Sequence, residues 1–372
     1  MKFSVSSNAL NKAVAKVFPG ISKTTNPVLL NYSIQVVDGQ LFMTSSDEEI
    51  FLQYTMPIDA DEDFDLLTDA GFFTNIVKVL PETMLTVESV DHLKLRISTE
   101  TGEYFVNYSS EQNFPQIPSV EKENVFTISG RMLREVIEGT LFSVDKNNQT
   151  RMAICGMLFD FTPDALVVVG TDGHKLIRRT LKDFTFETPS SIVVPEKTVG
   201  ILLKSMDDGD VTMYYSQNYV HFQMQDFYII SKLITQKFPN YNNVIPLENE
   251  NILTIDRKAL SAAVRRMLVF SNPRYQQIKL SITKTQVKLS SEDSNSQSRG
   301  EDTLSCDFQG SSMEISFNPT FLSELLNHLN AENVIIQMDT PTRAVVIFPD
   351  KQDSEAEEVL SLLMPVRLTS HS

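Results

Sequence analysis

The sequence has little of what marks secreted, membrane or metal-binding proteins. Its 372 residues include two cysteines, Cys155 and Cys306, and five histidines. Two thiols in a chain of this length indicate reduced residues rather than a disulfide framework. Every apolar run falls short of the roughly 18 residues that a membrane-spanning helix needs. The opening MKFSVSSNALNKAV has no apolar core flanked by small residues, so we expect no signal peptide and a cytoplasmic location.

Positive charge is also scarce. Asp and Glu number 48 against 32 Lys and Arg, which gives a formal net charge of −16. Binding to nucleic acid needs Lys and Arg gathered beside the phosphates. The average charge therefore argues against a nucleic-acid partner unless the charges are segregated. The hydrophobic share of 41% and charged share of 22% are ordinary for a globular protein.

An internal repeat organises the chain. The segments FSVSSNALNKAVAKVF, FTISGRMLREVIEGTLF and LTIDRKALSAAVRRMLVF each combine a short strand, a polar capping residue and an amphipathic helix. A second helix recurs in DAGFFTNIVKVLP, VPEKTVGILLKSM and NPTFLSELLNHLN, which begin with residues that start helices. Apolar strands that end in a turn recur at Asp47, Asp172 and Asp293. The positions expected on the buried face of the first helices are Leu10, Val14, Val17, Leu133, Ile137, Thr140, Leu260, Val264 and Met267.

The repeat predicts an α+β fold of three similar domains at 1–122, 123–250 and 251–372. Each domain is expected to have two helices packed on antiparallel sheets of about eight short strands. No Gly/Ser linker separates the domains, so we expect them to pack tightly. Three unrelated α+β domains would be the alternative, but several matches in the same order disfavour it. The helices are expected at 6–18, 69–80, 129–142, 194–206, 256–270 and 318–330.

The positive charge is concentrated on these helices. They carry 11 basic and 6 acidic residues, a net charge of +5, which leaves −21 for the rest of the chain. Basic residues on solvated helix faces are common. Three repeats arranged around one axis, however, would turn all their helices toward one region. A cationic inner surface within an anionic shell would hold a polyanion through its phosphates without reading its sequence.

Several motifs then match a known family in order along the chain. They are MKFSV at the start, RMAICGMLF at 151–159, GTDGHKL at 170–176, SKL with KFPNYNNVIP at 231–246, FNPTFLSELL at 317–326 and MPVRL at 364–368. On these motifs the chain resembles the bacterial sliding clamp, the beta subunit of DNA polymerase III. The resemblance implies a head-to-tail homodimer that forms a ring of six like domains around duplex DNA. It also implies a processivity factor without catalytic activity or cofactor.

The resemblance gives the TDGH segment a role in protein binding. In this family it borders a pocket for short peptide motifs, which implies as partners the DNA polymerase III alpha subunit, the clamp-loader delta subunit and other clamp-motif proteins. Apolar walls with a few polar groups suit an extended peptide, and Met364 would be an adaptable gate. The implied pocket comprises Arg151, Ile154, Thr171, Gly173, His174, Lys175, Leu176, Pro239, Asn243, Val244, Asn318, Phe321, Arg343, Leu362, Leu363, Met364, Pro365, Val366 and Arg367.

The resemblance also implies contacts with DNA and between subunits. At the subunit seam, unpaired strand edges would join and leave no exposed edge. The implied seam residues are Tyr104 and Val106 of one subunit and Val269 and Phe270 of the other. The implied DNA contacts are Lys12, Lys16, Lys23, Lys78, Gln149, Lys197, Arg265 and Arg266.

Four stretches depart from the family pattern. Lys175 stands where arginine is frequent, which removes bidentate hydrogen bonding and bears on peptide preference. Ala70–Gly71 replaces residues that are basic in some relatives. Arg343 stands where a small polar residue is common. The tail Thr369–Ser372 extends past the usual end.

Two other functions remain as alternatives. One is a three-domain hydrolase that uses Asp172 and His174. Asp172 has no neighbouring carboxylate for acid–base chemistry, and GTDG lacks the Lys-Ser/Thr ending of a phosphate loop. No second His or Cys stands at ligand spacing from His174, so we expect no metal site. The other alternative is a repeat scaffold that binds proteins and never DNA.

Overall fold

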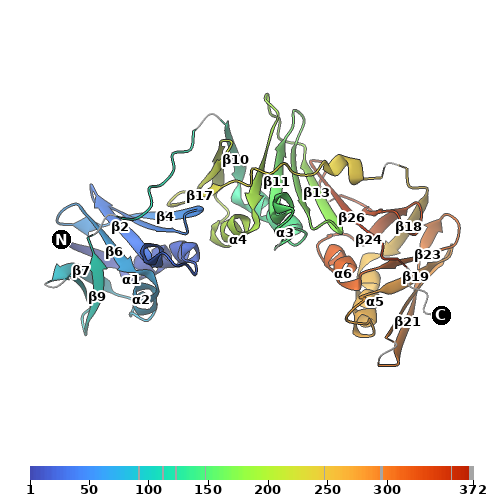
Figure 1. Cartoon of the computed structure of the whole chain (residues 1–372), viewed down its shortest axis with the longest axis horizontal. Coiled ribbons are helices and arrows are strands. Elements are labelled where there is room, and N and C mark those ends of the chain that lie inside the picture. The colour runs from blue at the N-terminus through green and yellow to red at the C-terminus, as the bar shows by residue number, and fades with distance from the viewer. Residues whose placement is uncertain are drawn as a thin grey trace. The chain divides into compact units, whose positions relative to one another are not determined.

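The computed structural model describes residues 1–90, 93–110, 113–121, 124–146, 148–246, 248–293, 296–352 and 354–367 (Figure 1). The expected boundary at 122/123 and the tail Thr369–Ser372 lie outside these residues. Contacts gather the chain into two compact units, Met1–Arg134 with Lys197–Leu233 and Glu135–Glu196 with Ile234–Ser372. The division between the units runs through two helices.

Six α-helices lie in the described residues, and each falls inside its expected range. They are α1 (Ser7–Val17), α2 (Ala70–Val77), α3 (Gly130–Leu141), α4 (Glu196–Ser205), α5 (Arg257–Val269) and α6 (Pro319–Asn327). Within the described residues, no helix is long and apolar enough to cross a bilayer.

Polar side chains fix where these helices begin. The carboxylate Oδ1 of Asp69 accepts a hydrogen bond from the N–H of Phe72 at 2.6 Å, and that of Asp256 from the N–H of Ala259 at 2.6 Å. The amide oxygen of Asn318 does the same for α6, whose first residue is a proline. Such caps satisfy backbone donors that have no partner inside the helix.

The first unit is built on one 13-stranded sheet in the order β10-β15-β16-β17-β4-β3-β2-β6-β9-β8-β7-β1-β5. All of its strand pairs are antiparallel. Its strands are β1 (Lys2–Ser6), β2 (Asn31–Val37), β3 (Gln40–Ser46), β4 (Ile50–Pro57), β5 (Asp59–Ala60), β6 (Phe64–Asp69), β7 (Met84–Val90), β8 (Lys94–Ser98), β9 (Glu103–Ser109), β10 (Asn124–Ser129), β15 (Asp210–Tyr215), β16 (Tyr219–Gln223) and β17 (Phe227–Lys232).

The second unit has a nine-stranded sheet, β14-β11-β12-β13-β26-β25-β24-β18-β22, and a four-stranded sheet, β21-β20-β19-β23. Its strands are β11 (Gly156–Phe161), β12 (Leu166–Thr171), β13 (Lys175–Leu181), β14 (Ser190–Pro195), β18 (Asn251–Asp256), β19 (Ile278–Ile282), β20 (Gln286–Asp293), β21 (Ser298–Ser305), β22 (Asp307–Gln309), β23 (Met313–Phe317), β24 (Asn333–Met338), β25 (Val345–Pro349) and β26 (Glu357–Leu363).

Successive repeats are joined by strand pairing in both units. In the first unit β17 pairs with β4, so that Ile230 lies opposite Phe51. In the second unit β26 pairs with β13, and Leu362 lies opposite Leu176. In each case the last strand of one repeat hydrogen-bonds to the hairpin strand of the repeat before it.

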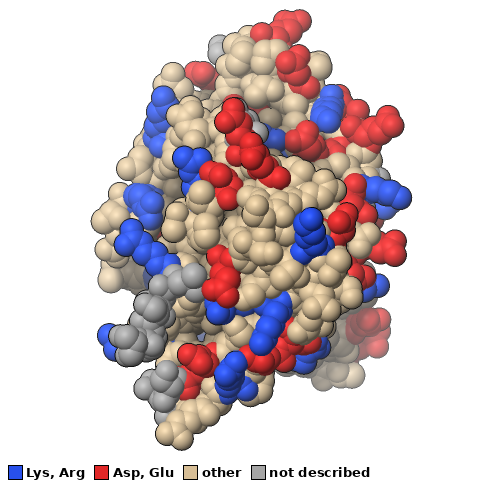
Figure 2. Space-filling model, turned by 90° about the vertical axis from the view of Figure 1, so that its right-hand side faces the viewer, with Lys and Arg blue, Asp and Glu red and all other residues tan. Residues whose placement is uncertain are grey.

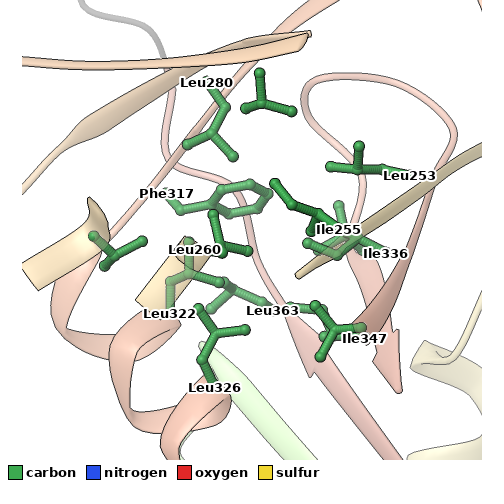
Figure 3. Packing of buried hydrophobic residues seen from close by; sticks show 14 of the residues in the cluster. Leu253, Ile255, Leu260, Leu280, Phe317, Leu322, Leu326, Ile336, Ile347 and Leu363 are labelled. Carbon is green, nitrogen blue, oxygen red and sulfur yellow. The ribbon is translucent and has the colours of Figure 1, made fainter. Parts of the chain in front are cut away.

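The helices pack their apolar faces onto these sheets as the repeat predicts. Figure 3 shows Leu260 of α5 beside Leu322 and Leu326 of α6, with Phe317 and Leu280 above them. All nine residues expected on the buried faces are at most 3% exposed. Tight packing of this kind leaves little room for relaxation when a side chain is shortened.

We expect Leu260→Ala to lower the free energy of unfolding by about 2–5 kcal/mol, because a cavity replaces contacts with both helices and the sheets. Leu268, on the same helix, is 37% exposed, so Leu268→Ala is the matched control and costs about 1 kcal/mol or less. Hydrogen exchange of the α5 amides measures both effects. Equal protection in the two variants would contradict the packing.

Candidate functional site

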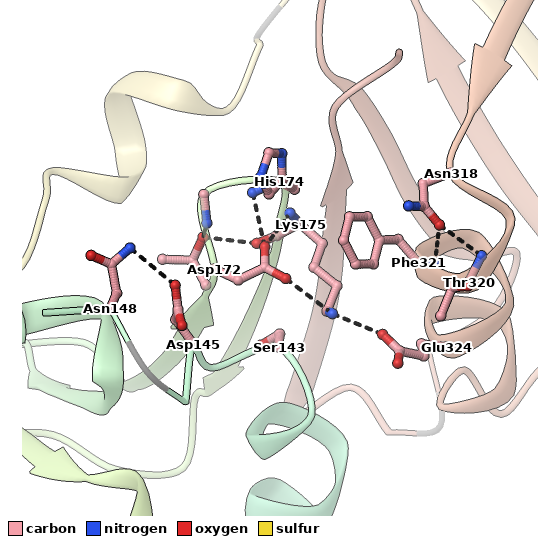
Figure 4. A network of polar contacts seen from close by, with 12 residues as sticks. Ser143, Asp145, Asn148, Asp172, His174, Lys175, Asn318, Thr320, Phe321 and Glu324 are labelled. Atoms are coloured by element: carbon pink, nitrogen blue, oxygen red, sulfur yellow. Dashed lines mark hydrogen bonds and ion pairs between the residues drawn. The ribbon is translucent and has the colours of Figure 1, made fainter. Parts of the chain in front are cut away.

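The turn between β12 and β13 is held by Asp172. Its Oδ1 accepts hydrogen bonds from the backbone N–H of His174 at 2.8 Å and of Lys175 at 2.9 Å (Figure 4). Gly173 has φ +88°, a conformation that favours glycine. Asp47 makes the same two bonds in the equivalent turn of the first repeat. The aspartate is therefore a repeated turn residue, which removes the basis for the hydrolase alternative.

Lys175 is a buried cation with two carboxylate partners. Its side chain is 6% exposed, and its Nζ lies 2.7 Å from Glu324 Oε2 and 3.1 Å from Asp172 Oδ2. The same Nζ lies 4.5 Å from the centroid of the Phe321 ring. A buried charge needs such partners to offset its lost hydration. Lys175 thus ties the β12–β13 turn to α6 and is not an open wall of a pocket.

An aromatic pair stands above this ion pair. The rings of His174 and Phe321 are stacked, with centroids 5.8 Å apart and planes 21° apart. His174 is exposed and Phe321 is partly exposed. Figure 4 shows the Lys175 side chain reaching between Asp172 and Glu324 beside the Phe321 ring. The exposed ring faces offer an apolar, polarisable surface.

The apolar floor of the site is formed where β13, β26 and the segment after β17 meet. Leu176 and Leu362 are 3% and 4% exposed and belong to one buried cluster with Phe238 and Tyr241. Ile245 and Ala344 pack against the same cluster. Ile154, on the short helix Met152–Cys155, is 2% exposed. Leu363 is fully buried in a different cluster, the one below α5 and α6.

A side-chain hydrogen bond helps to anchor the segment that carries Asn243 and Val244. The hydroxyl of Tyr241 donates to Asp160 Oδ2 at 2.8 Å, at the start of the short helix Tyr241–Val244. Burial, followed by the Asp160 hydrogen bond and charge, raises the pKa of Tyr241 to about 12. The phenol therefore stays protonated and keeps its hydrogen bond at neutral pH. Val244 is 52% exposed at the rim.

Met364 continues the strand ladder past β26 and stands over the turn. Its N–H donates to the carbonyl of His174 at 2.8 Å, and its side chain is 39% exposed. Two residues further, the N–H of Val366 donates to the carbonyl of Ser316 at 2.9 Å. The backbone of the 364–367 segment is thus hydrogen-bonded to both neighbouring segments, and Met364 remains exposed at its surface.

Two of the remaining implied pocket residues, Thr171 and Arg151, lie at the turn. Thr171 completes the turn, because its hydroxyl donates to the carbonyl of Lys175 at 2.7 Å. The guanidinium of Arg151 lies beside Gly173, at 3.2 Å from the position that a Cβ would occupy if this residue had a side chain. Arg343 instead pairs with Asp339 at 2.6 Å within its own turn. Asn318 caps α6, Pro365 is partly exposed, and Pro239 and Arg367 are exposed.

Sequence patterns missed three residues on which the site depends. Glu324, Tyr241 and Asp160 hold the turn and the segment after β17 in place. Tyr241 lies inside the motif KFPNYNNVIP, so this motif could have identified it as a residue of the site. Glu324 and Lys175 are 149 positions apart, and no local spacing reveals such a pair.

The cations expected to contact DNA are mostly engaged with neighbouring side chains or carbonyls in the first unit. Lys16 donates to the carbonyl of Ser205, and burial lowers the pKa of its ammonium group. A hydrogen bond with Tyr54 raises the pKa of Lys12. Lys197 pairs with Asp47. Lys78 lies 5.4 Å from the ring centroid of Phe18, and Lys23 is exposed.

In the second unit, Arg266 donates to Asp302 at 2.8 Å and Arg265 donates to Asn327 at 3.0 Å, while Gln149 is exposed. Exposed pairs of this kind contribute at most about 1 kcal/mol. Phosphate can therefore replace the protein partner at small cost. The six helices carry ten basic and four acidic residues. By contrast, the face in Figure 2 has Lys and Arg interspersed with Asp and Glu.

Among the strands with an edge that is unpaired in the described chain are β9, over most of its length, and β21. β9 pairs with β8 along its length but with β6 only through Tyr108 and Ser109, and β21 is the last strand of its sheet. Val106, an implied seam residue, is 2% exposed and faces its own core, whereas Phe105 is 51% exposed. Successive strand residues point to opposite faces, so Phe105 is the outward side chain next to the half-buried Tyr104.

The implied seam residues of α5 differ in exposure. Val269 is 80% exposed. Phe270 is partly buried, because Gly300 leaves room for its ring: a Cβ there would lie 2.5 Å from Phe270 Cδ2. Within the described ranges, no three His, Cys, Asp or Glu side chains are grouped to hold a metal ion.

Comparisons with known proteins agree along the whole chain. Models of the DNA polymerase III beta subunit match at 1–118 for the N-terminal domain, 127–240 for the central domain and 242–367 for the C-terminal domain. The beta sliding clamp of Escherichia coli K12 is 27% identical, over 99% of this chain and 100% of its own length. That of Pseudomonas putida is 28% identical with the same coverage.

Solved structures give the same result. The crystal structure of DNA polymerase III subunit beta from Pseudomonas aeruginosa superposes with a TM-score of 0.93 at 25% identity, covering 99% of this chain and 100% of that one. A DnaN sliding clamp from the same organism bound to griselimycin has a TM-score of 0.92 at 25% identity and the same coverage.

We expect Tyr241→Phe to speed hydrogen exchange of the amides at 238–246, because a hydrogen bond to a carboxylate contributes about 1.5–3 kcal/mol. Mass spectrometry of that segment is the measurement. Tyr275→Phe, at a side chain 51% exposed, is the control and should leave the segment unchanged. Unaltered exchange in Tyr241→Phe would show that the segment is held by other contacts.

Proposed function

Since the chain belongs to the DNA polymerase III beta subunit family, we propose how its surfaces perform the work of a clamp. Family membership makes it a sliding clamp, a processivity factor without a catalytic site of its own. Its fold is that of the clamp: three similar domains of helices on antiparallel sheets. Its partners are DNA and a polymerase. The proposed domain limits are 1–122, 123–250 and 251–372, and the proposed location is cytoplasmic.

The peptide-binding surface is proposed at the β12–β13 turn. Support comes from the apolar floor of Leu176 and Leu362, the exposed ring of His174 stacked on the partly exposed ring of Phe321, and the rim residue Met364. An extended peptide with leucine or phenylalanine anchors fits such a surface, and the unbranched Met364 adapts to several sequences. The proposed occupants are the alpha subunit of the polymerase, the delta subunit of the clamp loader and other proteins with the same motif.

Within this surface Lys175 is proposed to act through position. Its Nζ is taken up by Asp172 and Glu324 and by the Phe321 ring. Lys175, which stands where arginine is frequent in the family, therefore sets how closely α6 approaches the turn. It does not supply a contact to the peptide. Peptide preference follows from the spacing between His174 and Phe321.

The DNA-binding surface is proposed on the helices. Their surplus of basic residues in an acidic chain supports it, together with pairs that phosphate can displace. The proposed contacts are Lys12, Lys16, Lys23, Lys78, Gln149, Lys197, Arg265 and Arg266. Contacts of this kind bind without sequence preference and permit sliding. The chain is proposed to close around duplex DNA as a head-to-tail homodimer.

The subunit seam is proposed between two of the unpaired edges, β9 of one copy and β21 of the other. At both junctions inside the chain, the last strand of one repeat pairs with the hairpin strand of the repeat before it. This arrangement supports the same pairing between two copies. Phe105 and Tyr104 would then lie beside Val269 and Phe270. A protein-binding scaffold that never binds DNA would not need to close into a ring. The circular-DNA experiment below separates such a scaffold from a clamp.

We expect Met364→Ala to weaken binding of a polymerase-derived clamp-motif peptide about tenfold or more, because the rim loses its apolar contact. Fluorescence titration with a labelled peptide measures the dissociation constant. Met84→Ala, at a 62% exposed side chain on β7, is the control and should leave the constant unchanged. Equal affinities for all three proteins would refute this peptide surface.

We expect the loaded protein to remain on a nicked circular duplex and to leave the same DNA once it is linearised. A ring is held by topology and not by strong contacts, so open ends release it. Gel filtration of labelled protein before and after linearisation is the measurement, with end-blocked linear DNA as control. Equal retention on open and on blocked ends would contradict encirclement and indicate ordinary binding. No retention on the circle would favour the scaffold that does not bind DNA.

A further inference from the structure

A buried arginine lies at the junction between the second and third repeats. Arg179 of β13 has a side chain that is 11% exposed, and its Nη1 lies 2.5 Å from Oε1 of Glu357 on β26. Its Nε is buried and has no hydrogen-bond partner among the described residues. The ion pair with Glu357 therefore fixes one end of the guanidinium, and the shape of the surrounding space fixes the rest. Arg179 belongs neither to the proposed DNA contacts nor to the proposed peptide surface.

The space for this guanidinium is left by a glycine inside α3. A Cβ on Gly139 would lie 2.0 Å from Nη2 of Arg179 and 2.4 Å from its Cζ, far closer than such atoms can approach. Glycine in the middle of a helix lowers the stability of that helix. By contrast, a Cβ on Gly200 of α4 would meet no atom within 4 Å. The glycine at 139 is therefore explained by Arg179.

The first junction has a cation at the corresponding place. Lys16 and Gly139 are each the tenth residue of their helices, α1 and α3. The ammonium group of Lys16 donates to the carbonyl of Ser205, the last residue of α4. It also lies 5.7 Å from the ring centroid of Phe227 on β17. The first junction thus carries its cation on the helix, at the position where the second junction has glycine.

At the second junction the cation comes from a strand but has the equivalent neighbours. Arg179 lines one cavity with His328 and Val359. His328 and Ser205 are each the tenth residue counted from the first residue of α6 and α4. Val359 and Phe227 also correspond, because they lie opposite equivalent residues of β13 and β4 in the strand ladders. Each junction therefore brings a cation to the end of the second helix, from α1 in one case and from β13 in the other.

A closed chain of contacts connects this arginine to the proposed peptide surface. Lys175 lies four residues before Arg179 on β13, and so on the same face of the strand, and pairs with Glu324 of α6. The carbonyl of Glu324 accepts a hydrogen bond from Nδ1 of His328. The His328 ring stacks on Phe142 just after α3, with centroids 3.8 Å apart, and α3 in turn packs on Arg179. A displacement at Arg179 therefore has continuous contacts through which to reach α6, the helix that lines the peptide surface.

We infer that Arg179 is a positioning residue for the proposed peptide surface. It holds β26 and the end of α6 against β13, and Gly139 keeps open the space that its guanidinium occupies. The inference rests on the proposed peptide surface and adds residues outside that surface that set its geometry. The spacing between the rings of His174 and Phe321 is the quantity that Arg179 controls.

Gly139→Ala tests the inference without removing a charge. The new Cβ displaces the guanidinium, so the dissociation constant of a polymerase-derived clamp-motif peptide should rise about threefold or more. Arg179→Ala should have a similar effect, and Gly139→Ala should add little to it, because the Cβ then meets no guanidinium. Gly200→Ala is the matched control and should leave the constant unchanged. Fluorescence titration gives the constants, and circular dichroism checks folding.

A second readout reports on the geometry itself. The NMR signal of the His174 ring depends on the ring current of Phe321, whose centroid lies 5.8 Å away. Gly139→Ala and Arg179→Ala should both shift this signal, whereas Gly200→Ala should leave it in place. His174→Gln assigns the signal.

The outcomes separate the role of Arg179 from the peptide surface. A loss of affinity that both variants share, that does not add in the double variant and that accompanies the His174 shift supports the inference. Full affinity or an unshifted His174 signal in both folded variants overturns it, as does an equal effect of Gly200→Ala or a fully additive double variant. A wild-type protein that does not bind the peptide contradicts the proposed peptide surface instead, and the His174 signal then decides the role of Arg179 alone.

Discussion

The structure depends on how each repeat satisfies the edge of its last strand. An unpaired edge leaves backbone donors and acceptors open to aggregation, so it has to be paired or covered. Within the chain, β17 hydrogen-bonds to β4 and β26 to β13. The same ladder that joins two repeats brings Met364 to the carbonyl of His174. The proposed peptide surface therefore depends on the junction between two repeats, because both repeats contribute residues to it.

Buried charge gives this junction a definite geometry. Lys175 loses its hydration at the joint and regains interaction with Asp172, Glu324 and the Phe321 ring. Removing one partner of such a group is costly because it leaves an uncompensated charge. The spacing of the turn and α6 is therefore fixed more firmly than apolar contacts alone would fix it. The exposed cations of the helices are held only weakly by their protein partners, as suits the sliding contacts with DNA that are proposed for them.

Local chemistry explains what could be predicted from the sequence. Helix positions followed from caps such as Asp69, Asp256 and Asn318, and buried faces followed from apolar spacing. The turn at Asp172 was recognisable, but the role proposed for it came from the family motifs. Pairings between distant residues, such as Lys175 with Glu324, have no local signal. A shift of one residue along a strand reverses the facing of a side chain, which is why Phe105 and not Val106 points outward.

The central claim is that β9 of one copy completes the sheet edge at β21 of another. Hydrogen exchange of the backbone amides in these two strands, followed over a dilution series, tests it most directly. The account predicts alternating protected amides in both strands at high concentration, lost together on dilution, while β17 and β26 stay protected throughout. Rapid exchange in β9 and β21 at every concentration, with the protein folded, would contradict it.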